Sequence, residues 1–159
     1  MNTKSGFSLM ELMVTVSIMA LLAVIAMPNF MRFLAKAKRA EAYVNLHSIY
    51  AAQKAYWVEH GTYSTVLLGQ GGIGWKPEGY AGGGEKENFY YTYGFPGAEG
   101  QHYFTGKLAE SASHLGSAQA GKDSFLAVAA GDIDGDGEPD ILTIDHNNTV
   151  RIVRNDLES

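Results

Sequence analysis

The stretch that decides the fold is GFSLMELMVTVSIMALLAVIAMPNF, residues 6–30. Between Phe7 and Met31 it carries one charged residue, Glu11. At about 1.5 Å of rise per residue, a helix from Leu12 to Met31 reaches about 30 Å, which is the thickness of a bilayer's hydrocarbon core. The stretch therefore predicts a membrane-spanning helix near the start of the chain.

A helix that served only as a membrane anchor would not need the charge of Glu11. An ionised side chain in lipid is costly and is kept mainly where it finds a partner. We therefore interpret Glu11 as a docking group. A contact with an amine of a neighbouring copy would neutralise both charges, and it would fix the axial register of the two chains more than it would add net stability.

Residues 6–30, with their continuation NFMRFLAKAKRAEAYVNLHSIYAAQKAY from Asn29, resemble the N-terminus of type IV pilins and of the pseudopilins of type II secretion. The resemblance covers about the first third of the chain. It implies that a prepilin peptidase removes a leader, residues 1–6, by cutting after Gly6, and that the new terminus, Phe7, is methylated. It also implies assembly roles for Glu11 and Pro28, which become the fifth and twenty-second residues of the mature chain.

The function implied by this resemblance is that of a major type IV pilin. Such a chain is a single-pass precursor in the inner membrane, and an assembly platform extrudes it through an outer-membrane secretin. The product is a homopolymeric extracellular filament for adhesion and motility. Two alternatives stay open: the major pseudopilin of a type II secretion system, and a calcium-dependent adhesive head on a simple anchor that does not polymerise.

Other classes of function find little support in the composition. The formal net charge of −5 argues against a generic nucleic-acid binder. No nucleophile or acid–base grouping stands out, so we expect no enzyme. An ordinary secretory signal cleaved near Ala26 is disfavoured because an acid at Glu11 is foreign to its apolar region.

The expected fold is α+β, with one long N-terminal helix packed on a small antiparallel sheet. We divide the chain into the leader 1–6, a hydrophobic helix 7–31 and a globular head 32–159. Within the head we expect a helical continuation at 32–59, a glycine-rich loop at 60–100 and a β-meander at 101–159. Strand patterns occur at 88–95, 101–108, 124–130, 140–145 and 149–155, each bounded by turn residues. Between these elements we expect a helix C-cap at Gly61, a polar connector at 111–123 and a tight hairpin turn at 145–148.

Two further sequence features concern the long N-terminal helix. Apolar residues recur every three or four positions from Ala42 through Leu46 and Ile49 to Trp57, which predicts a helix face packed on the sheet. Pro28 lacks a backbone donor and clashes with the carbonyl of Val24, which predicts a kink or a locally unwound stretch. The family resemblance implies that this stretch melts and lengthens during assembly.

The segment GDIDGDGEPD, residues 131–140, predicts a metal site. Asp132, Asp134 and Asp136 alternate as calcium ligands do, and Gly137 follows in the position that allows a sharp turn. Glu138 can add its backbone carbonyl, and Asp140 can close the shell directly or through water. Thr143 stands where an EF-hand has glutamate, so a short loop between strands is expected. The chain has no cysteine, and bound calcium could replace a disulfide as a staple of the head.

Overall fold

The computed structural model describes residues 6–158. The chain divides into two compact units, Met1–Leu34 and Ala35–Ser159, and we call the second the head. The helix α1, Leu9–His60, begins in the first unit and ends in the second. Most of the expected leader, residues 1–5, lies outside the described residues, and Gly6 and Phe7 precede α1 and belong to no helix or strand.

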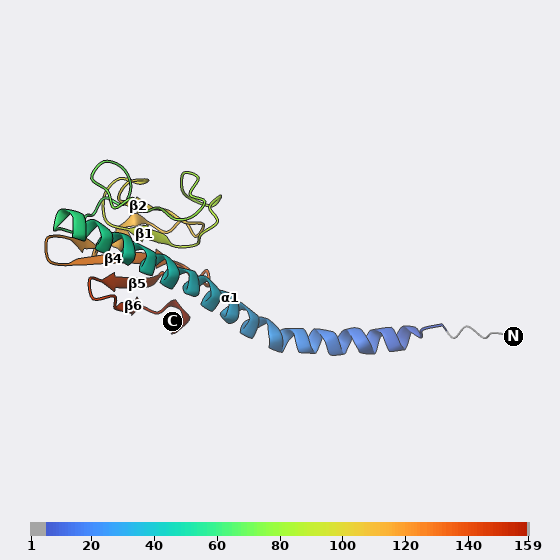
Figure 1. Ribbon diagram of the computed structural model, residues 1–159. Helices are drawn as coiled ribbons and strands as arrows, with labels where there is room; N and C mark the ends of the chain where they lie inside the picture. The colour runs from blue at the N-terminus through green and yellow to red at the C-terminus, as the bar shows by residue number, and fades with distance from the viewer. Residues whose placement is uncertain (1–5, 159) are drawn as a thin grey trace. The chain divides into compact units, whose positions relative to one another are not determined.

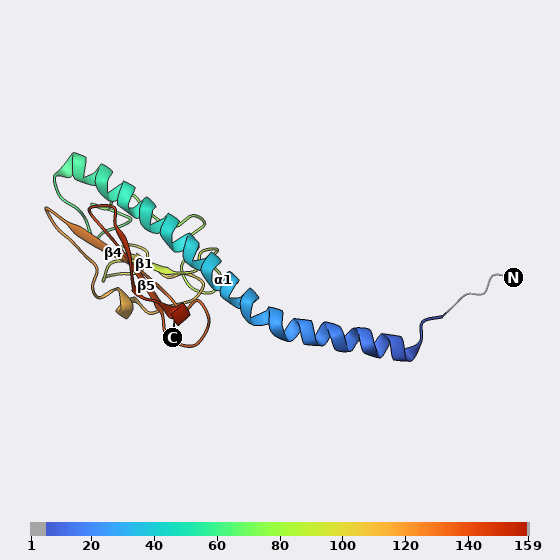
Figure 2. The ribbon, with the colours of Figure 1, turned by 90° about the horizontal axis from the view of Figure 1, so that it is seen from below.

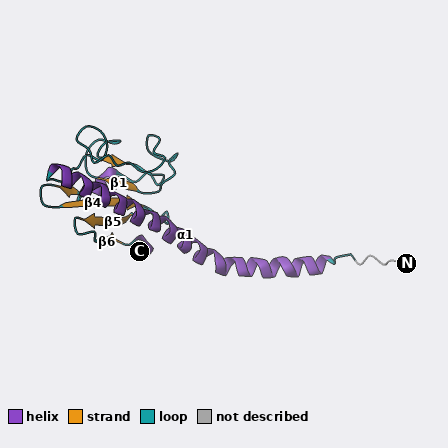
Figure 3. Cartoon of the chain, viewed as in Figure 1, coloured by secondary structure: helices purple, strands orange, loops and turns teal. Residues whose placement is uncertain are grey.

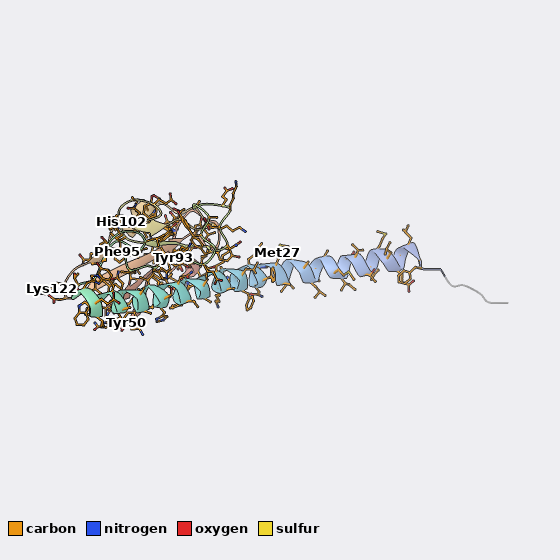
Figure 4. The ribbon with its side chains drawn as sticks, turned by 45° about the horizontal axis from the view of Figure 1, so that its top comes forward. Met27, Tyr50, Tyr93, Phe95, His102 and Lys122 are labelled. Atoms are coloured by element: carbon orange, nitrogen blue, oxygen red, sulfur yellow. The ribbon has the colours of Figure 1, made fainter. Side chains whose placement is uncertain are left out.

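The first unit consists of the apolar half of α1. It contains the only helix among the described residues that is long and apolar enough to cross a membrane. Its side chains stand away from the helix with no protein packed against them, as Figure 4 shows around Met27. The helix continues without interruption past Pro28, so the unwound stretch is absent from this structure. Melting on assembly stays a prediction.

In the head, the second half of α1 lies across the sheet (Figures 1 and 2). The residues that it buries are Ala35, Ala42, Leu46, Ile49 and Gln53, which recur at helical spacing. The predicted stripe is confirmed from Ala42 to Gln53, but it stops short of Trp57, which is 42% exposed.

Two sets of hydrogen bonds stabilise the C-terminal end of α1. Gly61 has a φ of +67° and donates its N–H to Trp57 O at 2.8 Å, as the C-cap expected there requires. The buried amide of Gln53 donates to Ser64 O at 2.6 Å and accepts from Ser64 N at 3.1 Å. These bonds fix the chain reversal that starts the glycine-rich loop.

The sheet is antiparallel and has six strands: β1 Thr92–Gly94, β2 Tyr103–Phe104, β3 Gln119–Ala120, β4 Phe125–Gly131, β5 Asp140–Asp145 and β6 Val150–Arg154. The strand order is β2-β1-β4-β5-β6, and β3 pairs with one end of β4. The α+β class is confirmed.

The simple meander is wrong in its first half. Strand β1, which lies within the expected loop 60–100, pairs with β4, and β2 occupies the edge beyond it. Phe104 and Tyr93 form cross-strand partners in the hairpin, and both are fully buried. Burying these aromatic rings against the middle of the sheet favours this order over the sequential one.

The glycine-rich segment between α1 and β1 contains no helix or strand and consists of loops (Figure 3). Aromatic side chains anchor it. Trp75 is buried, lies edge-on to Tyr93 and Phe104, and donates its indole N–H to Ser48 of α1 at 2.7 Å. The buried carboxylate of Glu87 accepts N–H bonds from Ala81 and Gly83. The loop is thus part of the core of the head.

Short helical turns complete the head. A 3-10 helix, η1 Ala112–Leu115, packs near β1 and β4 in the segment expected to be a plain connector. A second, η2 Asp156–Glu158, follows β6 and contacts β5. The β5–β6 pair ends in the expected tight turn, in which Asp145 Oδ1 accepts N–H bonds from Asn147 and Thr149.

Candidate functional site

The start of α1 contains two of the predicted residues: Phe7, expected to be methylated, precedes the helix, and Glu11, expected to act in assembly, lies in its first turn. Phe7 is 76% exposed, and Ser8 is the residue just before the first helical turn. Ser8 donates its backbone N–H to Glu11 Oε2 at 3.4 Å, and its carbonyl accepts the N–H of Leu12 at 3.1 Å. This is one half of a capping box, whose S-x-x-E pattern was readable in the sequence but was not used there.

Glu11 therefore has a local partner as well as its predicted partner in another copy. In the single chain it caps its own helix, and the adjacent surface is a groove of about 430 Å³ lined by Ser8, Met10, Val14 and Thr15. A free amine at Phe7 would stand next to this carboxylate after cleavage. The arrangement can hold an ammonium group from the same chain or from a neighbour.

The acidic loop after β4 is shaped by its own aspartates. Asp132 accepts N–H bonds from Gly135 at 2.6 Å and from Gly137 at 3.0 Å. Gly135 has a φ of +89°, which side chains rarely tolerate, so the reversal needs glycine there. Asp136 Oδ1 accepts the N–H of Glu138 at 2.8 Å. The carboxylates are in this way turned towards the inside of the loop.

Four carboxylates gather at this loop: Asp132, Asp134, Asp136 and Asp156, each with an oxygen within 4.8 Å of the others. Asp156 is buried and comes from η2, where it accepts the N–H of Ile133 at 2.8 Å. Burial, together with the charges of Asp134 and Asp132, raises the pKa of Asp156 to about 6. The donor set consists of hard oxygens and suits calcium in kind.

Glu138 and Asp140, the other predicted ligands, lie in different contacts. The carboxylate of Glu138 pairs with Arg154 of β6 at 2.7 Å on the surface. Asp140 is fully buried, pairs with Arg39 of α1 at 2.7 Å, and accepts the Tyr91 hydroxyl at 2.7 Å. In the structure, the predicted ligands Asp132, Asp134 and Asp136 thus lie close to Asp156. The Asp140 side chain is instead buried in the core of the head.

The Arg39–Asp140 pair ties three parts of the head to one another. Arg39 binds both oxygens of Asp140 and also the side-chain oxygen of Asn155, next to η2. Asp140 Oδ1 in turn accepts the N–H of Asp156 at 3.3 Å. Burial and the neighbouring Asp140 charge raise the pKa of Tyr91, so it stays a hydrogen-bond donor. Helix α1, strand β5 and the C-terminal segment are thereby joined without a disulfide.

The acidic loop also contacts α1 through Lys38. Its ammonium group donates to Ile133 O at 2.7 Å and lies over the Tyr90 ring. Lys38, Arg39 and Asp156 were not predicted as neighbours of the loop. A cluster of basic residues after the membrane stretch was visible, but no spacing rule connects it to a loop about 95 residues away.

Two comparisons with known proteins match parts of this chain. A family model described as the prokaryotic N-terminal methylation motif matches residues 1–27. The type IV major pilin protein PilA of Myxococcus xanthus (strain DK1622) is 45% identical over 73 residues, which is 46% of this chain and 32% of that protein. The match thus spans about a third of the length of that relative. The predicted resemblance to type IV pilins is confirmed.

Proposed function

We propose that this chain is the major structural subunit of a type IV pilus. The observation that carries the proposal is an uninterrupted apolar helix, exposed along its whole first half, with one carboxylate at its entrance. Such a surface has to be covered, by lipid before assembly and by other copies afterwards. The methylation motif and the identity to a major pilin support the same reading.

The finer steps belong to the same proposal. A prepilin peptidase cuts after Gly6 and Phe7 is methylated. The precursor then waits in the inner membrane, and a platform and an outer-membrane secretin export the growing homopolymer to the cell surface. There the filament serves adhesion and motility. The pseudopilin alternative is less favoured, because the relative that matches is named as a type IV major pilin.

Replacing Glu11 tests the assembly role, and the capping box makes the test sharper. Glu11→Ala removes both the charge and the cap, whereas Glu11→Gln keeps an acceptor that suits the capping box and removes only the charge. If the charge pairs with a neighbouring copy, both variants insert into the membrane but yield no filaments in sheared fractions. Normal filaments from Glu11→Gln would show that the cap alone suffices and would contradict the charge role.

We also propose that the acidic loop binds a structural calcium ion through Asp132, Asp134 and Asp136, with Glu138 contributing its backbone carbonyl. The spacing of the three aspartates and the gathering of hard oxygens support this proposal. Asp156 is an additional candidate ligand, and Asp140 would act only through water or through its contact with the Asp156 N–H. Bound calcium would join β4 to the C-terminal segment.

A further inference from the structure

A second carboxylate of α1 lies beside a cavity in the head. The cavity measures about 460 Å³ and lies between the helix and the glycine-rich loop. Its lining combines two carboxylates, two amides and apolar surface: Glu41, Glu78, Asn45, Asn88, Val44 and Phe89. Val44, which also lines it, is 69% exposed, whereas Phe89 is buried. The lining is therefore acidic and polar, with one exposed apolar side chain.

The Glu41 carboxylate is held in place but has no cation of its own. Its Oε1 accepts the Tyr90 N–H at 2.9 Å and the Tyr93 hydroxyl at 3.1 Å. Among the residues that the structure describes, no lysine or arginine pairs with Glu41. Burial raises the pKa of Glu41, and the two hydrogen bonds only partly offset this. An oriented carboxylate without a counter-charge would be stabilised by an added cation.

Lys36 supplies the complementary charge on the same helix. It is exposed and makes no ion pair within the part of the chain that the structure describes. Lys38 and Arg39, by contrast, are occupied by Ile133 and Asp140. Each copy thus carries an oriented carboxylate and, five positions earlier, an exposed ammonium group that cannot curl back around the helix to meet it.

The axial register of the proposed filament brings these groups level. If residues 7–11 are helical in the filament and the amine of Phe7 meets Glu11 of a neighbour, adjacent copies are offset by four residues, or about 6 Å along helices parallel to the axis. Lys36 precedes Glu41 by five residues, or about 7.5 Å. The same offset therefore leaves the two groups within about 1.5 Å of one level, well within the reach of a four-carbon side chain.

We propose that the cavity beside Glu41 receives the Lys36 ammonium group of a neighbouring copy of this chain. The contact rests on the proposed function, because it requires a filament. It forms a second register contact in the head, parallel to the one at Glu11. Its main effect is on alignment of the copies, since ion pairs at the edge of an interface contribute little net energy.

Cross-linking of separately tagged copies tests this contact. The natural chain has no cysteine, so a short bis-maleimide can join only positions where cysteine is introduced. Chains with Lys36→Cys and chains with Glu78→Cys, an exposed residue of the cavity, are co-expressed, and sheared filaments containing both are treated. We expect mixed dimers from this pair. The matched pair Lys36→Cys and Glu59→Cys, with Glu59 exposed about 27 Å further along α1 than Glu41, should give none.

The cross-linking result and the presence of filaments together distinguish a failure of the Lys36 contact from a failure of the proposed pilus function. Filaments that contain both chains but give no more mixed dimer than the control pair overturn the Lys36 contact and leave the pilus subunit intact. A wild-type chain that forms no filaments contradicts both.

A double-mutant cycle that removes the two charges provides a second test of the contact between Lys36 and Glu41. Glu41→Gln keeps the acceptor used by Tyr90, and Lys36→Gln removes only an exposed charge. We expect each to lower the yield of sheared filaments several-fold and the double variant to fall no further than the weaker single. Lys86→Gln, which removes an exposed lysine of the loop, should leave the yield unchanged. Losses that multiply in the double variant would show that the two residues act independently and would overturn the proposal.

Discussion

At the scale of single residues, the head depends on one buried ion pair. The Asp140 side chain is fully buried and that of Arg39 is 12% exposed. Replacing Arg39 with Met would leave the Asp140 charge in the core without its cation. We expect the free energy of unfolding of the full chain in detergent to fall by about 3–5 kcal/mol, as measured by denaturant titration.

The surface pair of Arg154 and Glu138 is the matched control for this variant. Its side chains are 46% and 63% exposed, so Arg154→Met should cost less than about 1 kcal/mol. Equal and small losses for Arg39→Met and Arg154→Met would contradict the role given to the buried pair.

The titration of Glu41 gives the head a pH dependence of known sign. Burial raises its pKa from 4.5, with opposition from the Tyr90 N–H and the Tyr93 hydroxyl. The folded state therefore holds this proton more tightly than the unfolded state. The stability contributed by Glu41 is present below pH 4.5 and is lost as the pH rises through the higher folded pKa.

Comparison with Glu41→Gln isolates this contribution, because glutamine does not titrate. As the pH rises from 4.5, the wild-type chain should lose stability relative to Glu41→Gln in thermal melts. A difference that changes in the opposite direction would show that the hydrogen bonds, and not burial, dominate the environment of this carboxylate.

At the scale of elements, the acidic loop should couple metal binding to the stability of the head. Calcium at about 100 times its dissociation constant adds about 2.7 kcal/mol to the folded state. A chelator should therefore lower the melting temperature of the full chain in detergent. Asp134→Asn should abolish this shift, whereas Asp145→Asn, which alters an acid in the β5–β6 turn, should retain it. A melting curve that does not respond to chelation would refute the calcium proposal.

Among these elements, the sequence predicted those that depend on nearby residues, but not the neighbours that depend on packing between distant segments. Local patterns located α1, its C-cap at Gly61 and the turn at Asp145, because each depends on residues within a few positions of one another. The place of β1 beside β4 and the approach of Asp156 to Asp134 depend on packing between distant segments. No periodicity records such neighbours, so the strand order was wrong and Asp156 was missed.

Asp140 shows, for a single residue, the limit of predicting a metal ligand from its spacing in the sequence. Its position after the aspartate repeat fits a calcium ligand and also fits the first residue of β5. Which fits better depends on Arg39, about 100 residues earlier, whose guanidinium binds both of its oxygens. Ligand spacing alone cannot distinguish a metal from a basic side chain as the partner of a carboxylate.

At the scale of the whole molecule, the two units would have separate roles in the proposed filament subunit. The apolar half of α1 offers an exposed surface that only lipid or other copies can cover, and the head carries its own buried core. The carboxylates at Glu11 and Glu41 would then set the register of neighbouring chains at two levels. Deletion of the chain should remove sheared surface filaments, whereas loss of exoprotein release with intact filaments would favour the pseudopilin alternative.

The mass of the N-terminal peptide of the native protein tests the central claim most directly. If the chain is processed for assembly, protein from sheared filaments begins at Phe7 and carries one additional methyl group on its amine. A native chain that retains residues 1–6, or that begins after Ala26, would contradict the account, because the amine needed opposite Glu11 would then be absent.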